Sequence, residues 1–130
     1  MVGLRASLLI VLFLLVIPTN AYPIIISNSA INHTQAKLLV YSIPNEYYKY
    51  VDVIEFVSKP IKYYNNDEIA NAYYRIWFYN NNCVKGKIWI FWNPPNYNEL
   101  THELGHFYEI CILKQQTTEL FANNFKFLLM

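Results

Sequence analysis

The histidine and glutamate residues in the last quarter of the chain have the types and the spacing needed to activate a water molecule. His102 and His106 enclose Glu103 in the segment His-Glu-Leu-Gly-His, which is the HExxH pattern. On a helix four residues turn through about 400°, so both imidazoles lie on one face and can bind the same metal ion. Glu103 lies about 100° round the helix from His102, where it can reach a metal-bound water rather than the metal. The pattern predicts zinc-dependent hydrolysis with Glu103 as the general base.

A third protein ligand is needed, because a catalytic zinc has three protein ligands and one open position. The chain has three histidines, and the remaining one, His33, lies far upstream in a polar segment. Glu99 and Glu109 belong to the same helix as the histidines. Glu99 suits a capping or supporting role there, and Glu109 lies too far along the axis to share an ion with His102. Glu119 follows a polar break and can approach from a second helix, so we predict Glu119 as the third ligand of one zinc per chain.

Two helices have to position these side chains. An asparagine cap, Asn96 or Asn98, can begin a helix over residues 99–111 that carries the motif. A threonine cap, Thr117 or Thr118, can begin a last helix that carries the third ligand. The motif could also arise by chance, but these caps and the apolar strand before them favour a real site.

Upstream of the motif, short apolar runs alternate with polar turns. This order of elements predicts an α+β fold in one domain. Residues 73–79 are open to a helical reading, although their aromatic content favours a strand. The elements expected are strands over residues 37–42, 61–64, 73–79 and 87–92 and a helix over residues 46–58.

The N-terminus has the pattern of a secretory signal peptide. Residues 8–17 form an apolar run of ten, too short for a membrane span, and Pro18 follows it. Cleavage after Ala21 would separate a signal peptide, 1–21, from a mature domain, 22–130. The alternative is an uncleaved membrane anchor that continues into the next apolar residues. We therefore expect a secreted, extracellular protein, or a membrane-anchored one if the segment is retained.

Composition restricts the partners that the chain can have. The formal net charge of +1 and the isoelectric point near 7.7 argue against nucleic acid, and against a membrane surface once the signal has been cleaved. The two cysteines, Cys83 and Cys111, suggest a disulfide in an exported chain, and two buried free thiols are the alternative. The partner that remains is a peptide or protein substrate.

The region from residue 87 to residue 130 resembles a known family. The segment 101–106 followed by the segment 119–125 is similar to the minimal gluzincins, and most of all to the ImmA/IrrE-type peptidases, in which HELGH precedes a helix with an E-x-x-A-N-x-F pattern. The resemblance implies a zincin-like fold, with a small mixed or antiparallel sheet, and a zinc metallopeptidase activity. It assigns the zinc ligands His102, His106 and Glu119 and the catalytic base Glu103.

The resemblance also predicts how substrate binds. In zincins the strand before the active-site helix commonly forms an edge that pairs with extended substrate, which here implies residues 87–92. Trp89 and Trp92 would line a pocket there or lie in the core. A Cys83–Cys111 bridge would tie the turn before this strand to the end of the helix.

A peptidase of this kind also needs a group that stabilises the oxyanion formed during hydrolysis. No tyrosine, histidine or arginine follows Glu119. Tyr108, an earlier tyrosine or zinc alone would therefore have to stabilise the oxyanion. The alternative function is a non-catalytic, zinc-bound interaction module, secreted or at a surface, with a degenerate peptidase site.

Overall fold

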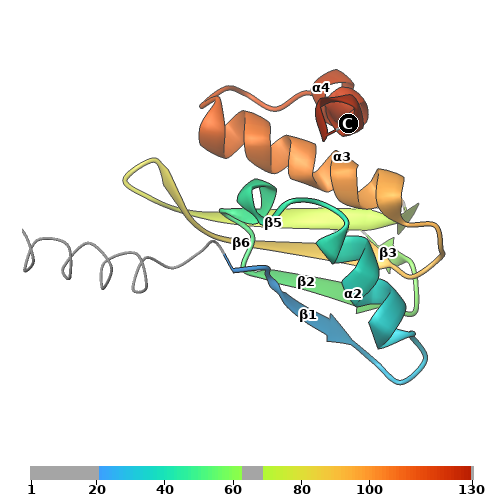
Figure 1. Ribbon diagram of the computed structural model, residues 1–130. Coiled ribbons are helices and arrows are strands. Elements are labelled where there is room, and N and C mark those ends of the chain that lie inside the picture. Colours follow the sequence, from blue (N-terminus) through green and yellow to red (C-terminus); the bar gives the residue numbers. More distant parts are fainter. Residues whose placement is uncertain (1–20, 63–68, 130) are drawn as a thin grey trace, which may run out of the picture.

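The computed structural model of the protein places a mixed sheet under a layer of helices (Figure 1). It describes residues 21–62 and 69–129, so the expected signal peptide lies outside the described residues except for Ala21. No helix within the described ranges is long and apolar enough to cross a membrane. In chain order the elements are β1 Ile24–Ser27, α2 His33–Tyr41, η1 Asn45–Tyr48, β2 Val53–Val57, β3 Ile61–Lys62, β4 Ile69–Ala70, β5 Ala72–Tyr79, β6 Asn82–Phe91, α3 Tyr97–Phe107, η2 Tyr108–Ile112, α4 Glu119–Asn124 and η3 Phe125–Leu129.

The main sheet has four strands in the order β1-β2-β6-β5. β1 pairs parallel with β2, β2 pairs parallel with β6, and β5 pairs antiparallel with β6. This confirms the expected α+β fold with a small mixed sheet. The prediction that residues 87–92 form the edge is wrong, because Lys87 pairs with Val53 on one side and with Arg75 on the other. The edge strands are β1 and β5, and β5 is the one that contacts α3.

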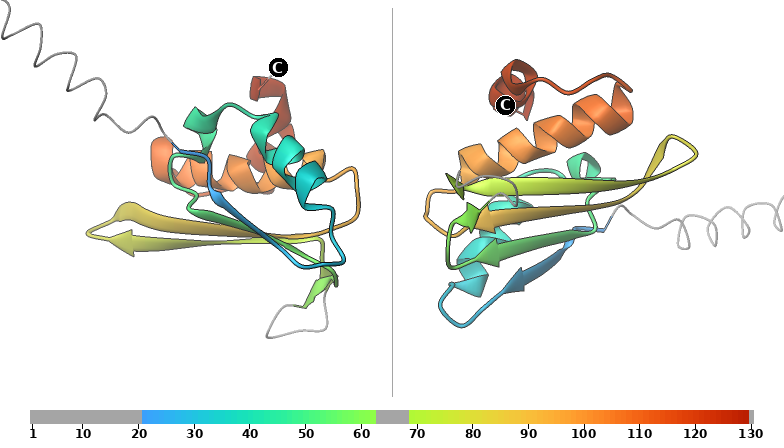
Figure 2. Two further views of the ribbon diagram at one scale, coloured as in Figure 1. Left: turned by 60° about the horizontal axis from the view of Figure 1, so that its bottom comes forward. Right: turned by 180° about the vertical axis from the view of Figure 1, so that it is seen from behind.

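The helices cover one face of this sheet, as the left view of Figure 2 shows. Alternate residues of β2 and β6 point toward the helices, as the two-residue period of a strand requires. The core between the layers is formed by fully buried side chains of these strands and of α2 and α3: Ala36, Val40, Ile54, Phe56, Ile88, Ile90, Leu100 and Leu104.

The strand predicted over residues 37–42 is wrong, because most of this segment lies in helix α2. Asn32 caps the helix, its side-chain oxygen accepting a hydrogen bond from the backbone N–H of Gln35. Ala36 and Val40, one turn apart, are the buried residues of α2. An N-cap and a four-residue spacing therefore outweigh the apolar run that suggested a strand.

The helix predicted over residues 46–58 is also wrong. The segment begins as the short 3-10 helix η1, which ends where the Tyr48 hydroxyl donates to the carbonyl oxygen of Val40. It then extends into β2, where Ile54 and Phe56 are buried and their neighbours are not. β2 lies between two parallel partners, and that pairing decides its conformation.

The remaining predictions agree with the structure in part or in full. The strand over residues 73–79 is confirmed as β5, and of the strand over 61–64 the described part is β3. The helix over 99–111 begins two residues earlier, as α3, and changes to the π-helical turn η2 after Phe107. Strand β1 is an element that the sequence reading did not predict.

Candidate metal centre

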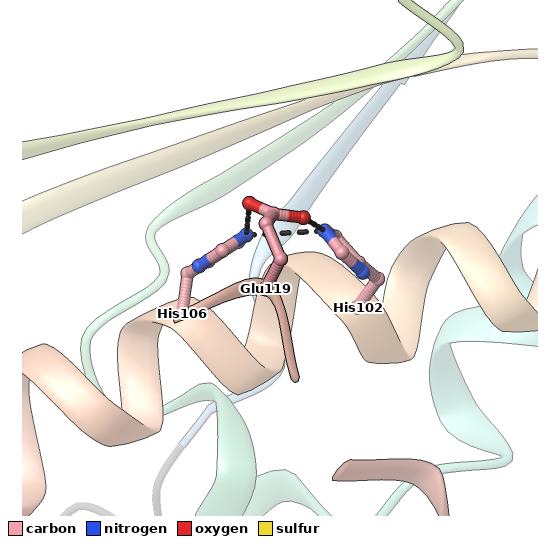
Figure 3. Close-up of side chains that lie close together, drawn as sticks. All are labelled: His102, His106 and Glu119. Carbon is pink, nitrogen blue, oxygen red and sulfur yellow. Dashed lines mark hydrogen bonds and ion pairs between the residues drawn. The ribbon is translucent and has the colours of Figure 1, made fainter. Parts of the chain in front are cut away.

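Three side chains from two helices converge at one point beside the sheet (Figure 3). The Nε2 atom of His102 lies 3.0 Å from Oε2 of Glu119, and Nε2 of His106 lies 3.3 Å from Oε1. The two Nε2 atoms are 3.1 Å apart. All three donor atoms lie within 4.8 Å of one another, so this group could hold a metal ion.

The far nitrogen of each imidazole is held by a second residue. His102 Nδ1 lies 2.8 Å from Oδ1 of Asn123, and since an amide oxygen only accepts, Nδ1 donates. His106 Nδ1 bonds the hydroxyl of Thr117. Partners of this kind fix the ring orientation of metal-binding histidines and direct the other nitrogen to the ion. Sequence reasoning missed both partners, although Asn123 follows Glu119 by one helical turn.

Gly105 allows the two helices to approach closely. A Cβ atom at this position would lie 2.8 Å from Cα of Ala122 and 2.9 Å from Cβ of Phe125. Contacts this short do not occur between real side chains, so a larger residue would push α4 away from α3. Glycine lowers the stability of the helix, but here it allows α4 to approach α3 closely. That approach brings Glu119 to the histidines.

The start of α4 is fixed by the predicted threonine cap. Thr118 has an extended backbone and its hydroxyl accepts a hydrogen bond from the N–H of Phe121. Glu119 is the first residue of the helix, and its side chain is 74% exposed. Asn96 holds the N-cap position of α3 but makes no capping bond, because its Oδ1 accepts from the backbone N–H of Asn93 instead, while its amide nitrogen donates to the carbonyl oxygen of Phe91.

Glu103 is buried beside the cluster and lines the same cleft. It is only 5% exposed. Burial and, secondarily, the negative charge of Glu119 raise the pKa of Glu103 from 4.5 to about 8. The pKa of His106 is lowered by burial and by the charge of His102, which outweigh the opposing effects of Glu119 and Glu109. His106 therefore favours the neutral form that metal binding requires.

The site opens into a cleft of about 590 Å³ between α3 and the edge strand β5. The ring of Tyr74 stacks on His106, with centroids 4.8 Å apart and planes 20° from parallel. Neither Trp89 nor Trp92 is among the residues that line the cleft; Trp92 packs edge-on against Phe56, which is buried in the core. The lining is formed by Ala72, Tyr73, Tyr74, Arg75, Ile76, Phe78, His102, Glu103, His106, Ile110 and Glu119.

The other candidate residues of the sequence lie outside the cluster. His33 is exposed and bonds the Ser27 hydroxyl at 2.7 Å. Glu99 buries its Oε2 atom in the first turn of α3, without a hydrogen-bond partner in the described part of the chain. Glu109 accepts from Thr118, and Tyr108 stacks on aromatic residues of the last helices and does not line the cleft.

Cys83 and Cys111 form a disulfide in the structure, which confirms the expected pairing. Cys83 lies at the start of β6 and Cys111 lies in η2. The bridge therefore joins the C-terminal end of the helix that carries His102 and His106 to the sheet.

Comparisons with known proteins found no match to this chain. A scan against protein-family models matched none, and searches of curated proteins and of solved structures returned no match.

Proposed function

We propose that this chain is a secreted, zinc-dependent peptidase with a zincin-like catalytic domain. One observation carries the proposal: His102, His106 and Glu119 converge within 4.8 Å, and the buried Glu103 shares their cleft. A metal-binding group, a carboxylate that can take a proton and a cleft of substrate size are the parts that metal-assisted hydrolysis needs.

The donor set suits zinc. Two imidazole nitrogens and one carboxylate are a ligand set of catalytic zinc sites, which keep one position open for water. The hydrogen bond from Nδ1 of His102 to Asn123 leaves its Nε2 lone pair directed at the cluster. Zinc bound here would act as a Lewis acid and lower the pKa of a bound water to about 7.

Glu103 would move the proton in this reaction. Its carboxylate accepts a proton from the attacking water and later returns it to the amine that leaves. The raised pKa of Glu103 belongs to the metal-free protein, where burial and Glu119 favour the neutral form. A cation in the cluster would favour the carboxylate, the form that a general base requires.

The substrate would be an extended peptide. β5 is the edge of the sheet and one wall of the cleft. A peptide strand can add to such an edge through its main chain, which provides affinity without a requirement for one side chain. The peptide would then cross the site between β5 and α3.

Export is supported by two independent features. The apolar run at residues 8–17 is typical of a signal peptide. The Cys83–Cys111 disulfide suits an oxidising compartment, because cytosolic thiols are kept reduced.

The test combines metal analysis with a cleavage assay on the purified protein. We expect about one zinc per chain by elemental analysis, and cleavage of quenched fluorescent peptides that a chelator stops. Glu103→Gln should keep the zinc and lower kcat/KM by about 10²–10⁴-fold, the usual contribution of a general base. Glu46→Gln, in the exposed part of η1, is the matched control and should change neither.

Two outcomes would contradict the proposal. A protein purified without chelators that holds no zinc, and takes up none, has no metal centre of this kind. A protein that binds zinc but cleaves no peptide would favour the non-catalytic interaction module.

A further inference from the structure

Glu109 is a buried carboxylate whose place in the fold the catalytic reading does not explain. It lies in η2, one turn beyond His106, and is only 4% exposed. Within the described residues no lysine or arginine forms an ion pair with it. A buried, unpaired carboxylate costs stability unless hydrogen bonds compensate for lost water. Its hydrogen-bond partners therefore indicate which part of the structure Glu109 stabilises.

All the side-chain hydrogen bonds found for Glu109 reach one residue. Oε1 accepts from the backbone N–H of Thr118, and the Thr118 hydroxyl lies 3.4 Å from the same oxygen. The backbone contributes a further bond, because the carbonyl oxygen of Glu109 accepts from the N–H of Gln115 at 3.0 Å. Glu109 thus bonds the connection between η2 and α4 at two points, at Gln115 through its backbone and at Thr118 through its side chain.

Thr118 lies between two residues of the metal centre. Thr117, just before it, bonds Nδ1 of His106, and Glu119, just after it, supplies the carboxylate. Thr118 is also the residue that caps α4. A bond that fixes the Thr118 backbone therefore fixes the support of His106 and the first residue of α4 together.

Because the Glu119 side chain is exposed, its position depends on how firmly its backbone is held. The Glu119 side chain is 74% exposed, so core packing does not hold it in place. An exposed glutamate has several rotamers available, and ordering them reduces the affinity for a ligand. Fixing its backbone reduces the number of arrangements that have to be ordered on binding.

We propose that Glu109 is a positioning residue of the metal centre: its carboxylate locks Thr118, and through it the His106 partner Thr117 and the third ligand Glu119. The proposal rests on the metal centre of the proposed function. It assigns to Glu109 no contact with metal or substrate.

The experiment measures binding of Zn²⁺ and Co²⁺ alone to the metal-free protein, by calorimetry and by the visible absorption of the cobalt form. Glu109→Ala should weaken affinity for both ions by about 10–100-fold, the usual effect of losing a residue that supports a ligand. Its cobalt spectrum should change in shape, since the ligand geometry is no longer fixed. Glu109→Gln retains an acceptor for the Thr118 N–H and should restore both affinity and spectrum to near wild type.

A matched control separates positioning from general destabilisation. Glu55 is a partly buried carboxylate that bonds Lys87 Nζ at 2.9 Å, on a strand away from the cluster. Glu55→Ala should leave metal affinity and the cobalt spectrum unchanged. If Glu109→Ala does not fold, Glu109→Asp keeps the charge on a side chain too short to reach Thr118 and should show the same direction of change.

The outcomes distinguish this inference from the proposed function. Wild-type protein that binds neither ion contradicts the metal centre itself. Wild-type protein that binds normally, with Glu109→Ala or Glu109→Asp equally tight and spectrally identical, overturns the positioning role. Glu109→Gln as weak as Glu109→Ala would overturn the hydrogen-bond account.

Discussion

At the scale of single residues, Glu103 is the side chain whose proposed catalytic role conflicts with stability. It is 5% exposed, and burial followed by the charge of Glu119 raises its pKa to about 8. In the unfolded chain the carboxyl returns to a value near 4.5. Between these values the unfolded state releases a proton that the folded state keeps, so the free energy of unfolding falls as pH rises.

Glu103→Gln should therefore stabilise the metal-free protein, and more so at pH 8 than at pH 5. Glutamine has no proton to lose, so the gain should grow with pH and reach about 4 kcal/mol at pH 8, because the folded pKa lies about 3.5 above the unfolded one and each pKa unit is worth about 1.4 kcal/mol. Urea unfolding in the presence of a chelator, at both pH values, measures it. A gain of equal size at pH 5 and pH 8 would show that titration of Glu103 is not the cause.

Tyr74 is the tyrosine best placed to assist the proposed hydrolysis. Its ring stacks on His106 and lines the cleft, whereas Tyr108 does not line it. Tyr74→Phe retains the stacking surface and removes the hydroxyl. We expect zinc content to stay the same and kcat to fall by about 10-fold or more, since loss of one oxyanion donor costs up to about 10³-fold. An unchanged kcat would leave zinc alone to stabilise the oxyanion.

At the scale of elements, the contact between α3 and α4 determines whether three ligands meet. The contact depends on the absence of a side chain at Gly105, opposite Ala122. Leu104, its neighbour, points into the core and fixes the rotation of α3. The site is thus built from one helix bound to the sheet and one helix packed on the first.

Gly105→Ala tests this contact. Alanine favours a helix by about 1 kcal/mol, yet overpacking costs about 1–3 kcal/mol and should dominate. We expect lower stability in urea and weaker zinc binding by calorimetry. Lys37→Ala, on the exposed surface of helix α2, should change stability by less than about 0.5 kcal/mol. If Gly105→Ala stabilised the protein like an ordinary glycine replacement, the close packing would be disproved.

The range over which residues interact explains which elements could be predicted from the sequence. The ligands and the caps of α4 depend on spacings of a few residues, and His102, His106 and Glu119 meet as expected. The predictions for segments 37–42 and 46–58 are wrong for different reasons: Asn32 caps a helix over most of the first, and β2 in the second pairs with distant strands. The Asn32 cap is a local signal that the apolar run obscured, whereas the pairing of β2 depends on distant strands, which local sequence does not encode.

At the scale of the whole molecule, the disulfide joins the two layers of the fold. Helices cover one face of the sheet (Figure 2). Cys111, at the end of the motif helix, bonds Cys83 at the start of β6. The cysteines are 28 residues apart in sequence, and the chain between them contains the rest of β6 and all of α3. The bridge therefore restricts, in the unfolded chain, the segment that supplies both histidines.

Replacing both cysteines, Cys83→Ser with Cys111→Ser, should lower the free energy of unfolding by roughly 3–4 kcal/mol, the loop-entropy value for a closed loop of this length. Zinc affinity should fall less than tenfold while the protein is folded, because the three ligands and their hydrogen-bond partners stay in place. Urea unfolding with and without zinc measures both quantities.

Wild-type protein unfolded under reducing conditions is the matched control and should lose a similar amount of stability. If oxidised wild type and the double variant were equally stable, the bridge would contribute nothing to folding. If zinc binding disappeared in a folded double variant, the bridge would belong to the site rather than to the scaffold.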